Sequence, residues 1–155
     1  MGSTTDYQLN DSMGYWLHRA SHALRLAFDL VLAPHGVTTG QWAILSLCGQ
    51  QGAQTPTELV EAIGMDSGAM ARLLGRMTKK GLLQVQLNPR DARSKVFALT
   101  PRAQQLLPKI KRLSQQTNLL VLHDLGPRQR SAFLDLLRRI EKRAEAIGPE
   151  SIPES

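Results

Sequence analysis

The sequence is poor in cysteine, in aromatic residues and in long apolar segments. Cys48 is the only cysteine, so an internal disulfide is excluded. No apolar run approaches the ~20 residues that cross a bilayer. The first residues show neither the order of a signal peptide nor a myristoylation pattern, because Asp6 stands where that pattern needs Ser or Thr. We therefore expect a soluble, cytoplasmic protein with no membrane partner.

The sequence also lacks the residue patterns of common catalytic and metal sites. It contains neither the nucleophile pattern G-x-S-x-G nor the phosphate-binding pattern G-x-x-x-x-G-K-[ST]. His18 and His22 are one helical turn apart, but no Cys, Asp or Glu nearby completes a ligand set. Cys48 lies in an apolar segment, which favours an inert buried thiol over an oxidant sensor. We expect a protein that is not an enzyme and needs no cofactor or metal.

Charge gives the first positive indication of a partner. Nineteen Lys and Arg against thirteen Asp and Glu leave a formal net charge of +6, which favours a polyanion but does not choose among nucleic acid, acidic protein and anionic lipid. Residues 66–99 hold seven basic and two acidic residues, and seven minus two leaves +5. The basic residues are Arg72, Arg76, Lys79, Lys80, Arg90, Arg93 and Lys95. Most of the net charge therefore lies on one short stretch.

Helix-start signals divide the chain into six predicted helices. The starts, in chain order, are Ser12, Thr38, Thr55, Asp66, Thr100 and Pro127. Thr38 and Thr55 each open a capping box, in which a hydroxyl and a Gln or Glu side chain satisfy unpaired backbone amides. Residues 83–87 and 95–99 alternate apolar and polar side chains, which predicts a hairpin closed by residues 88–93. The predicted fold class is therefore mainly α with a small β wing.

Two of these helices form a predicted helix-turn-helix. Only Gly64 and Met65 separate the first from Asp66, which caps the second, and such a tight connection makes the helices cross steeply. The second helix carries a basic stripe apart from its apolar face. That stripe consists of Arg72, Arg76 and Lys79. A helix of this kind fits the major groove of DNA, where Arg can donate two hydrogen bonds to guanine.

Small residues flank the basic stripe and would let the helix backbone approach base edges closely. They are Ser67, Gly68, Ala69 and Gly75. Each glycine costs the helix about 1 kcal/mol relative to alanine. An isolated stripe would be interpreted as an ordinary solvated helix face. The adjoining turn and hairpin favour DNA contact instead.

The hairpin carries a more specific pattern. Asp91-Ala92-Arg93, five further residues and Leu99-Thr100 match D-x-R-x5-L-T, and with this wing signature the chain resembles the MarR family of bacterial transcriptional regulators over nearly its whole length. The resemblance implies a homodimeric winged helix-turn-helix with a helical dimerisation domain built from both termini. It also implies binding to pseudo-palindromic operators, the usual targets of the family.

The resemblance assigns roles within the wing. It implies that Arg93 enters the minor groove and that Asp91 helps to anchor it, which agrees with the attraction of Arg to narrow A·T minor grooves. The alternative is an Asx turn in which Asp91 bonds its own backbone and Arg93 is solvated. Ala92 and Ala103 stand where the family often has a basic residue and a glycine. We therefore expect reduced wing affinity but an unchanged fold.

The predicted organisation has two functional parts. Residues 12–36 and 101–147 form the helical dimerisation region, residues 37–100 form the winged helix-turn-helix, and residues 1–11 and 148–155 are flexible ends. The apolar stripes of the dimerisation helices exceed what one small core can cover, and a second copy of the chain would bury the surplus. The predicted DNA-contacting residues are Ser67, Gly68, Ala69, Arg72, Arg76, Lys79, Arg90, Asp91, Arg93 and Lys95.

Many members of the MarR family release DNA when a phenolic or carboxylate compound binds, so the resemblance implies a small aromatic effector. Trp16 and Arg19 lie three residues apart and could hold an aromatic anion by stacking and charge pairing. Packing in the apolar stripe is the alternative for Trp16, and Trp42 is expected in the core.

We predict a ligand-responsive repressor that binds double-stranded DNA as a homodimer. The rival hypothesis is a winged-helix protein-interaction module. In that module the basic helix would meet an acidic partner and bind no operator.

Overall fold

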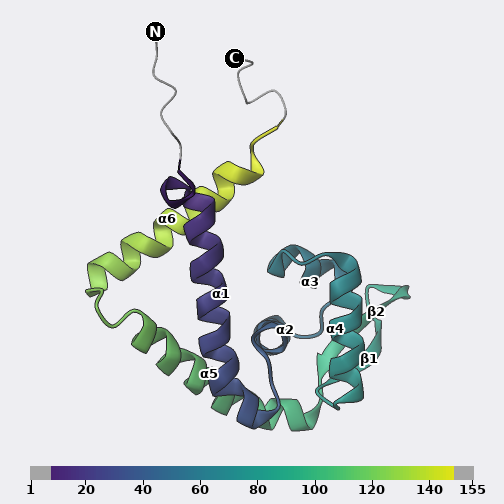
Figure 1. Ribbon diagram of the computed structural model, residues 1–155. Coiled ribbons are helices and arrows are strands. Elements are labelled where there is room, and N and C mark those ends of the chain that lie inside the picture. Colours follow the sequence, from purple (N-terminus) through teal and green to yellow (C-terminus); the bar gives the residue numbers. More distant parts are fainter. Residues whose placement is uncertain (1–7, 149–155) are drawn as a thin grey trace. The chain divides into compact units, whose positions relative to one another are not determined.

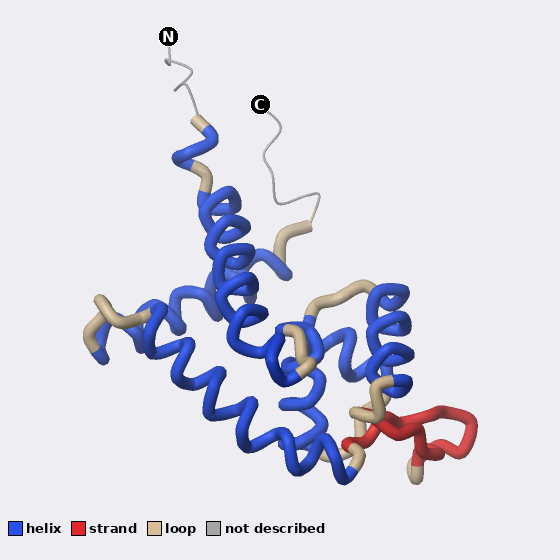
Figure 2. The backbone as a smooth tube through the Cα atoms, turned by 60° about the horizontal axis from the view of Figure 1, so that its bottom comes forward, coloured by secondary structure: helices blue, strands red, loops and turns tan. Residues whose placement is uncertain are grey.

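The computed structural model describes residues 8–148, which form a mainly helical chain with one β hairpin (Figures 1 and 2). Of the predicted flexible ends, residues 1–11 and 148–155, the segments 1–7 and 149–155 lie outside the described residues, whereas Leu9–Asp11 form a short 3-10 helix. The elements are η1 Leu9–Asp11, α1 Met13–Leu32, η2 Ala33–His35, α2 Thr39–Gln51, α3 Pro56–Ile63, α4 Ser67–Lys79, β1 Leu83–Asn88, β2 Asp91–Leu99, α5 Pro101–Val121 and α6 Pro127–Glu145. The predicted fold class is confirmed.

The helices begin at the predicted caps. The hydroxyls of Ser12, Thr38 and Thr55 accept hydrogen bonds from backbone amides three residues later, at 3.3, 3.4 and 3.2 Å. The Asp66 carboxylate does the same for Ala69 at 2.8 Å. The backbone amides of Thr38 and Thr55 in turn donate to the side chains of Gln41 and Glu58, so both capping boxes are complete. Local sequence therefore determines where these helices start.

The chain divides into two compact units, with the boundary between Thr117 and Asn118 inside α5. The first unit contains the hydrophobic core, which the end of α1, α2, α3, α4, the hairpin and the first half of α5 build together. Its fully buried side chains include Leu32, Ile44, Leu45, Leu59, Met70, Met77 and Ile110. Gly49 allows close packing of α2 on α5, because a Cβ there would lie 2.4 Å from Cδ2 of Leu107.

The hairpin is joined to the core at its base. Leu83 pairs with Leu99, and Phe97 also exchanges backbone hydrogen bonds with Gln54 at 2.8 and 3.0 Å, which ties β2 to the α2–α3 connection. Strand β2 begins at Asp91, so the turn is shorter than the predicted 88–93 segment. Of the alternating apolar residues of β1 only Leu83 is buried. The outer part of the hairpin extends past the helices in Figure 2, and its side chains Val85 and Leu87 are 44 and 71% exposed.

The second unit contains the end of α5 and the whole of α6. No residue of α6 is buried, and its apolar residues Phe133, Leu134 and Leu136 are 42 to 52% exposed.

Pro108 lies inside α5 and does not end it. Among the described residues, no helix is both long and apolar enough to cross a membrane.

Candidate nucleic-acid interface

Helices α3 and α4 form the predicted helix-turn-helix (Figure 1). Gly64 ends α3 with φ of 69°, a left-handed conformation that glycine adopts at low cost, and Asp66 caps α4 two residues later. One face of α4 is buried through Met70, Leu73, Leu74 and Met77. The predicted cations Arg72, Arg76 and Lys79 are exposed on α4. The apolar face thus fixes the helix while the cationic side chains stay in solvent.

The predicted small residues of α4 leave its backbone accessible on the exposed face. A Cβ on Gly75 would have no neighbour within 4 Å, and Ser67 and Gly68 are exposed. A Cβ on Gly68 would lie 3.3 Å from Nη1 of Arg72, so the glycine also leaves room for that guanidinium. Ala69 is half-buried. A flat ligand surface could therefore approach the backbone of this helix.

Short polar side chains hold the hairpin turn. Asn88 Oδ1 accepts from the amide of Arg90 at 2.9 Å, and Asp91 Oδ1 accepts from the amide of Arg93 at 3.0 Å. Asn88 Nδ2 donates to Ser94 Oγ at 2.8 Å, and that hydroxyl donates to the carbonyl of Asp91 at 3.1 Å. Asp91 thus forms the Asx turn of the alternative interpretation: it accepts from the backbone amide of Arg93, whose side chain is exposed. Sequence reasoning missed Asn88 and Ser94, although Asn before Pro is a common turn signal.

The cations of the two elements form a set that we call the basic surface: Arg72, Arg76 and Lys79 on α4, and Arg90, Arg93 and Lys95 on the hairpin. All six are exposed. Within residues 8–148, Arg90 is the only one of the six with an electrostatic interaction, because its charge helps to lower the pKa of Glu58. The main cause of that lowered pKa is the hydrogen bond from the Thr55 amide, followed by the bond from the Thr55 hydroxyl. These cations are therefore available to an anionic partner.

Lys80 is separate from the basic surface, although it belongs to the same charged stretch of sequence. Its Nζ donates to the carbonyl of Gly36 at 3.2 Å and to Gln41 Oε1 at 3.5 Å. Its own carbonyl accepts from Arg102 Nη1 at 3.0 Å. Lys80 thus joins α4 to the segment before α2.

The predicted ligand residues Trp16 and Arg19 do lie together, and Tyr15 joins them. The Arg19 guanidinium is 5.5 Å from the Tyr15 ring centroid and 5.7 Å from that of Trp16, within the range of a cation–π contact. Arg19 Nη1 also donates to the Tyr15 hydroxyl at 2.8 Å. Trp16 is 54% exposed and its Nε1 donates to the carbonyl of Asn10 at 2.7 Å. Tyr15 was missed, although it lies four residues before Arg19, a spacing that places the two side chains on the same face of a helix.

Two of the remaining candidates, Cys48 and Trp42, belong to the core of the first unit. Cys48 is buried, and burial raises the pKa of its thiol to about 11. Trp42 is partly buried against the core. The described residues contain no cluster of three His, Cys, Asp or Glu side chains that could hold a metal ion, so His18 and His22 gain no ligand partner there.

Comparison with known proteins identifies the winged region. Residues 37–95 match the MarR family. The chain is similar to a probable transcriptional regulator from Pseudomonas aeruginosa, with 26% identity over 86% of this chain and 99% of that one and a TM-score of 0.79. It is similar to BpsR from Bordetella bronchiseptica, whose DNA binding is regulated by 6-hydroxynicotinic acid, with 25% identity over 87% and 96% and a TM-score of 0.80.

The fold is also that of a MarR variant from E. coli in complex with operator DNA. The identity is 23%, the coverage is 83% of this chain and 92% of that chain, and the TM-score is 0.76. These matches extend beyond residues 37–95 to most of the helices on either side.

The Cys48 thiol is expected to resist alkylation in the folded protein. Because its pKa is raised from 9.0 to about 11, the thiolate fraction at neutral pH falls roughly 100-fold. Burial also blocks access of the reagent to the sulfur. Iodoacetamide labelling at pH 7.5, followed by mass spectrometry, should be at least that much slower for the folded chain than for the same chain in denaturant. Equal rates in the two conditions would contradict the burial.

Proposed function

We propose that this chain, whose residues 37–95 form a MarR-family domain, is a DNA-binding transcriptional regulator that recognises a pseudo-palindromic operator as a homodimer. The observation that carries the proposal is the basic surface. Six exposed cations lie on a helix and a hairpin, and both elements are fixed to one core. Such cations gain affinity for DNA by releasing counterions from phosphates.

Helix α4 is the proposed reader of the major groove. The groove is wide enough for an α-helix, and an Arg side chain can make a bidentate contact with guanine. Arg72 and Arg76 project from the exposed face that also carries Gly68 and Gly75, so the backbone can come close to base edges. Lys79, at the end of the helix, is placed as a phosphate contact.

The hairpin is the proposed minor-groove element. Arg93 is exposed, and the bond from its amide to Asp91 fixes the backbone without occupying the guanidinium. A guanidinium held in this way can enter a narrow minor groove, where the negative potential is greatest. Arg90 and Lys95 lie on the same hairpin and would contact the flanking phosphates.

Substitutions on the basic surface should separate base reading from phosphate attraction. Arg72→Ala is expected to cost about 1–3 kcal/mol of operator affinity and to relax base preference at one position, while Lys79→Ala should weaken all duplexes alike and reduce the salt slope by about 0.9. Fluorescence anisotropy over a series of salt concentrations would measure both effects, on an operator recovered by selection from random-sequence DNA.

Arg112→Ala is the matched control, because Arg112 is an exposed cation on α5 outside the basic surface. We expect its operator affinity to stay close to that of the unsubstituted chain. If Arg72→Ala and Arg93→Ala together leave binding unchanged, or if affinity does not fall with salt, the assignment of these residues is wrong. Binding of an acidic protein without any operator would favour the interaction-module hypothesis instead.

A homodimer is proposed because apolar side chains on three helices remain exposed in the single chain. They include Met13 and Trp16 of α1, Leu119 and Leu120 of α5, and Phe133 and Leu136 of α6, all between 42 and 74% exposed. Isolated apolar residues on a surface are ordinary, but stripes on helices usually mark an interface. A twofold dimer would also present two α4 helices to the two halves of an operator.

Sedimentation analysis should therefore give twice the 17.1 kDa mass of one chain. Leu136→Asp, in α6, is expected to weaken the dimer because it places a charge in the proposed apolar interface. Leu87→Asp is the matched control, since Leu87 is 71% exposed on the hairpin and outside the three helices. A single-chain mass for the unsubstituted protein, or equal effects of the two variants, would contradict the proposal.

A small aromatic acid is the proposed effector, and the cluster of Tyr15, Trp16 and Arg19 is its proposed contact. Two ring faces and a guanidinium could hold an aromatic carboxylate if Arg19 exchanged its intramolecular contacts for the ligand. In a Trp42→Phe variant, titration with 6-hydroxynicotinic acid or salicylate should change Trp16 fluorescence and lower DNA affinity. Arg19→Ala should abolish both responses. If DNA affinity responds but Trp16 fluorescence and Arg19→Ala do not, the effector binds elsewhere.

A further inference from the structure

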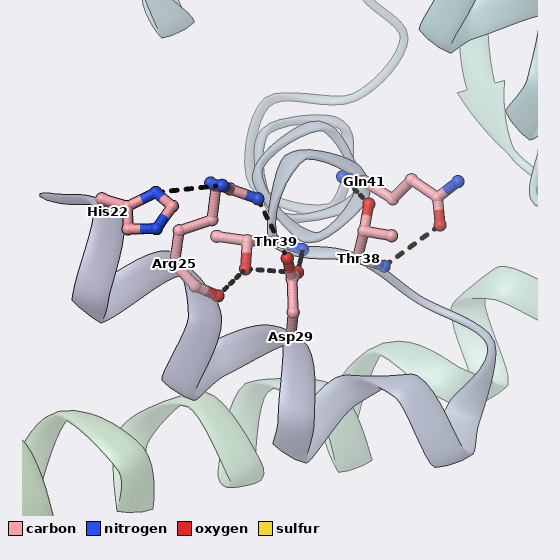
Figure 3. Close-up of polar contacts among 6 residues, drawn as sticks. All are labelled: His22, Arg25, Asp29, Thr38, Thr39 and Gln41. Carbon is pink, nitrogen blue, oxygen red and sulfur yellow. Dashed lines mark hydrogen bonds and ion pairs between the residues drawn. The ribbon is translucent and has the colours of Figure 1, made fainter.

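The start of α2 is held by a carboxylate that belongs to another helix. Asp29, near the end of α1, accepts hydrogen bonds at Oδ1 from the backbone amide of Thr39 at 2.7 Å and from its hydroxyl at 2.8 Å (Figure 3). The same hydroxyl lies 3.3 Å from the carbonyl oxygen of Arg25. Thr39 is the first residue of α2, so its amide has no acceptor within the helix. Asp29 therefore gives the positive end of α2 a charged partner from α1.

The orientation of Asp29 is fixed from its other side as well. Arg25 Nη1, one turn earlier on α1, lies 3.5 Å from Asp29 Oδ2. Arg25 Nη2 lies 3.3 Å from Nδ1 of His22, which completes a row of side chains along α1 (Figure 3). One carboxylate oxygen thus faces Thr39 and the other faces Arg25. The Asp29 side chain is only 31% exposed, so this contact is more protected than a typical surface pair.

The turn of α2 that Asp29 holds also contacts α4. A Cβ on Gly40 would lie 3.6 Å from Cδ2 of Leu73, so the backbone of the second α2 residue packs against an α4 side chain. Leu73 is buried, and the next residue towards the start of α4 is Arg72 of the basic surface. Asp29 is therefore connected to Arg72, a residue proposed to read bases, through Thr39, Gly40 and Leu73.

A second connection joins the same segment to the end of α4. Lys80 Nζ donates to the carbonyl of Gly36 and to Gln41 Oε1, and Gln41 Oε1 also accepts from the Thr38 amide at 3.2 Å. Gln41 is buried with 3% exposure, so this amide group has little freedom to move. Residues 36–41 are therefore joined to α1 through Arg25, Asp29 and Leu32, and to α4 and its C-cap through Leu73 and Lys80.

We propose that Asp29 is a positioning residue for operator recognition, which fixes the angle between α1 and α4 through the first turn of α2. The inference rests on the proposed function, in which α1 belongs to the dimerisation region and α4 reads DNA. In a twofold dimer this angle sets the separation of the two α4 helices, which has to match one turn of DNA, ~34 Å. A looser angle would let the helices follow several half-site separations, each with weaker binding.

The test compares operators that differ only in the spacing of two identical half-sites. The unsubstituted chain should show a sharp optimum. D29A, which removes both hydrogen bonds from Thr39 to the carboxylate, should lose at least about tenfold in affinity at that optimum, the factor expected for one hydrogen bond to a charged group. Its affinity for off-optimum spacings and for random duplex should stay unchanged, so the spacing profile becomes flat. D29N, which keeps an acceptor for the Thr39 amide, should retain the position of the optimum.

Two further variants separate positioning from simple stability. T39V removes only the hydroxyl that bonds Asp29 and Arg25, and should flatten the profile less than D29A. Q50A breaks a 3.1 Å hydrogen bond with Ser46 that lies wholly within α2 and outside the proposed dimer interface, and should leave the profile unchanged. Thermal unfolding of every variant is measured under the binding conditions. If D29A does not fold, T39V must still flatten the profile while D29N retains the position of the optimum.

The proposal is overturned if D29A and T39V keep the sharp profile, or if they weaken every spacing and random duplex by one common factor that follows their loss of stability. In both cases the unsubstituted chain still selects an operator, and the proposed function stands without this role for Asp29. A chain that selects no operator at all removes the proposed function, and the positioning role with it.

Discussion

Helix α4 has one face in the core and the opposite face in water with unpaired cations, and the rest of the first unit is arranged around that division. Met70 and Met77 are fully buried, whereas Arg72 and Arg76 are exposed. Neighbouring like charges repel, so the exposed face adds nothing to folding stability. Burying each large apolar side chain contributes roughly 1.5–3 kcal/mol. The buried face therefore has to hold the helix in place, and α2, α3 and the hairpin supply the surface against which it packs.

The acidic residues beside the basic surface are placed so that they do not neutralise it. Asp66 bonds the amide of Ala69, Asp91 bonds the amide of Arg93, and Glu58 bonds the amide of Thr55. Each carboxylate fixes a backbone turn, and within residues 8–148 none of the three forms an ion pair with a cation of the basic surface. The lowered pKa of Glu58 has the same main cause, a backbone hydrogen bond. These acids thus shape the surface, and only Glu58 also interacts electrostatically with one of its cations, Arg90.

Much of the fold could be predicted because its signals are local. A capping residue and its partner are three positions apart, so Thr38, Thr55 and Asp66 could be identified from the sequence alone. The Asp29–Thr39 contact spans ten residues and the Lys80–Gly36 contact spans 44, and no pattern in the sequence relates such pairs. Strand periodicity predicted the hairpin but could not show whether another element would cover its outer part. The basic surface was predictable in composition, whereas the contacts that orient it were not.

Helix α6, in the second unit, is the one α-helix among the described residues that has no buried residue. Helix α6 has 19 residues and none of them is buried, although it carries apolar side chains along its length. Capping by Gln129, which accepts from the Gly126 amide at 2.8 Å, helps the helix to start but cannot replace a packed face. A helix of this length is marginal in water without tertiary packing. The proposed homodimer would cover these apolar side chains in the step that also pairs the two α4 helices.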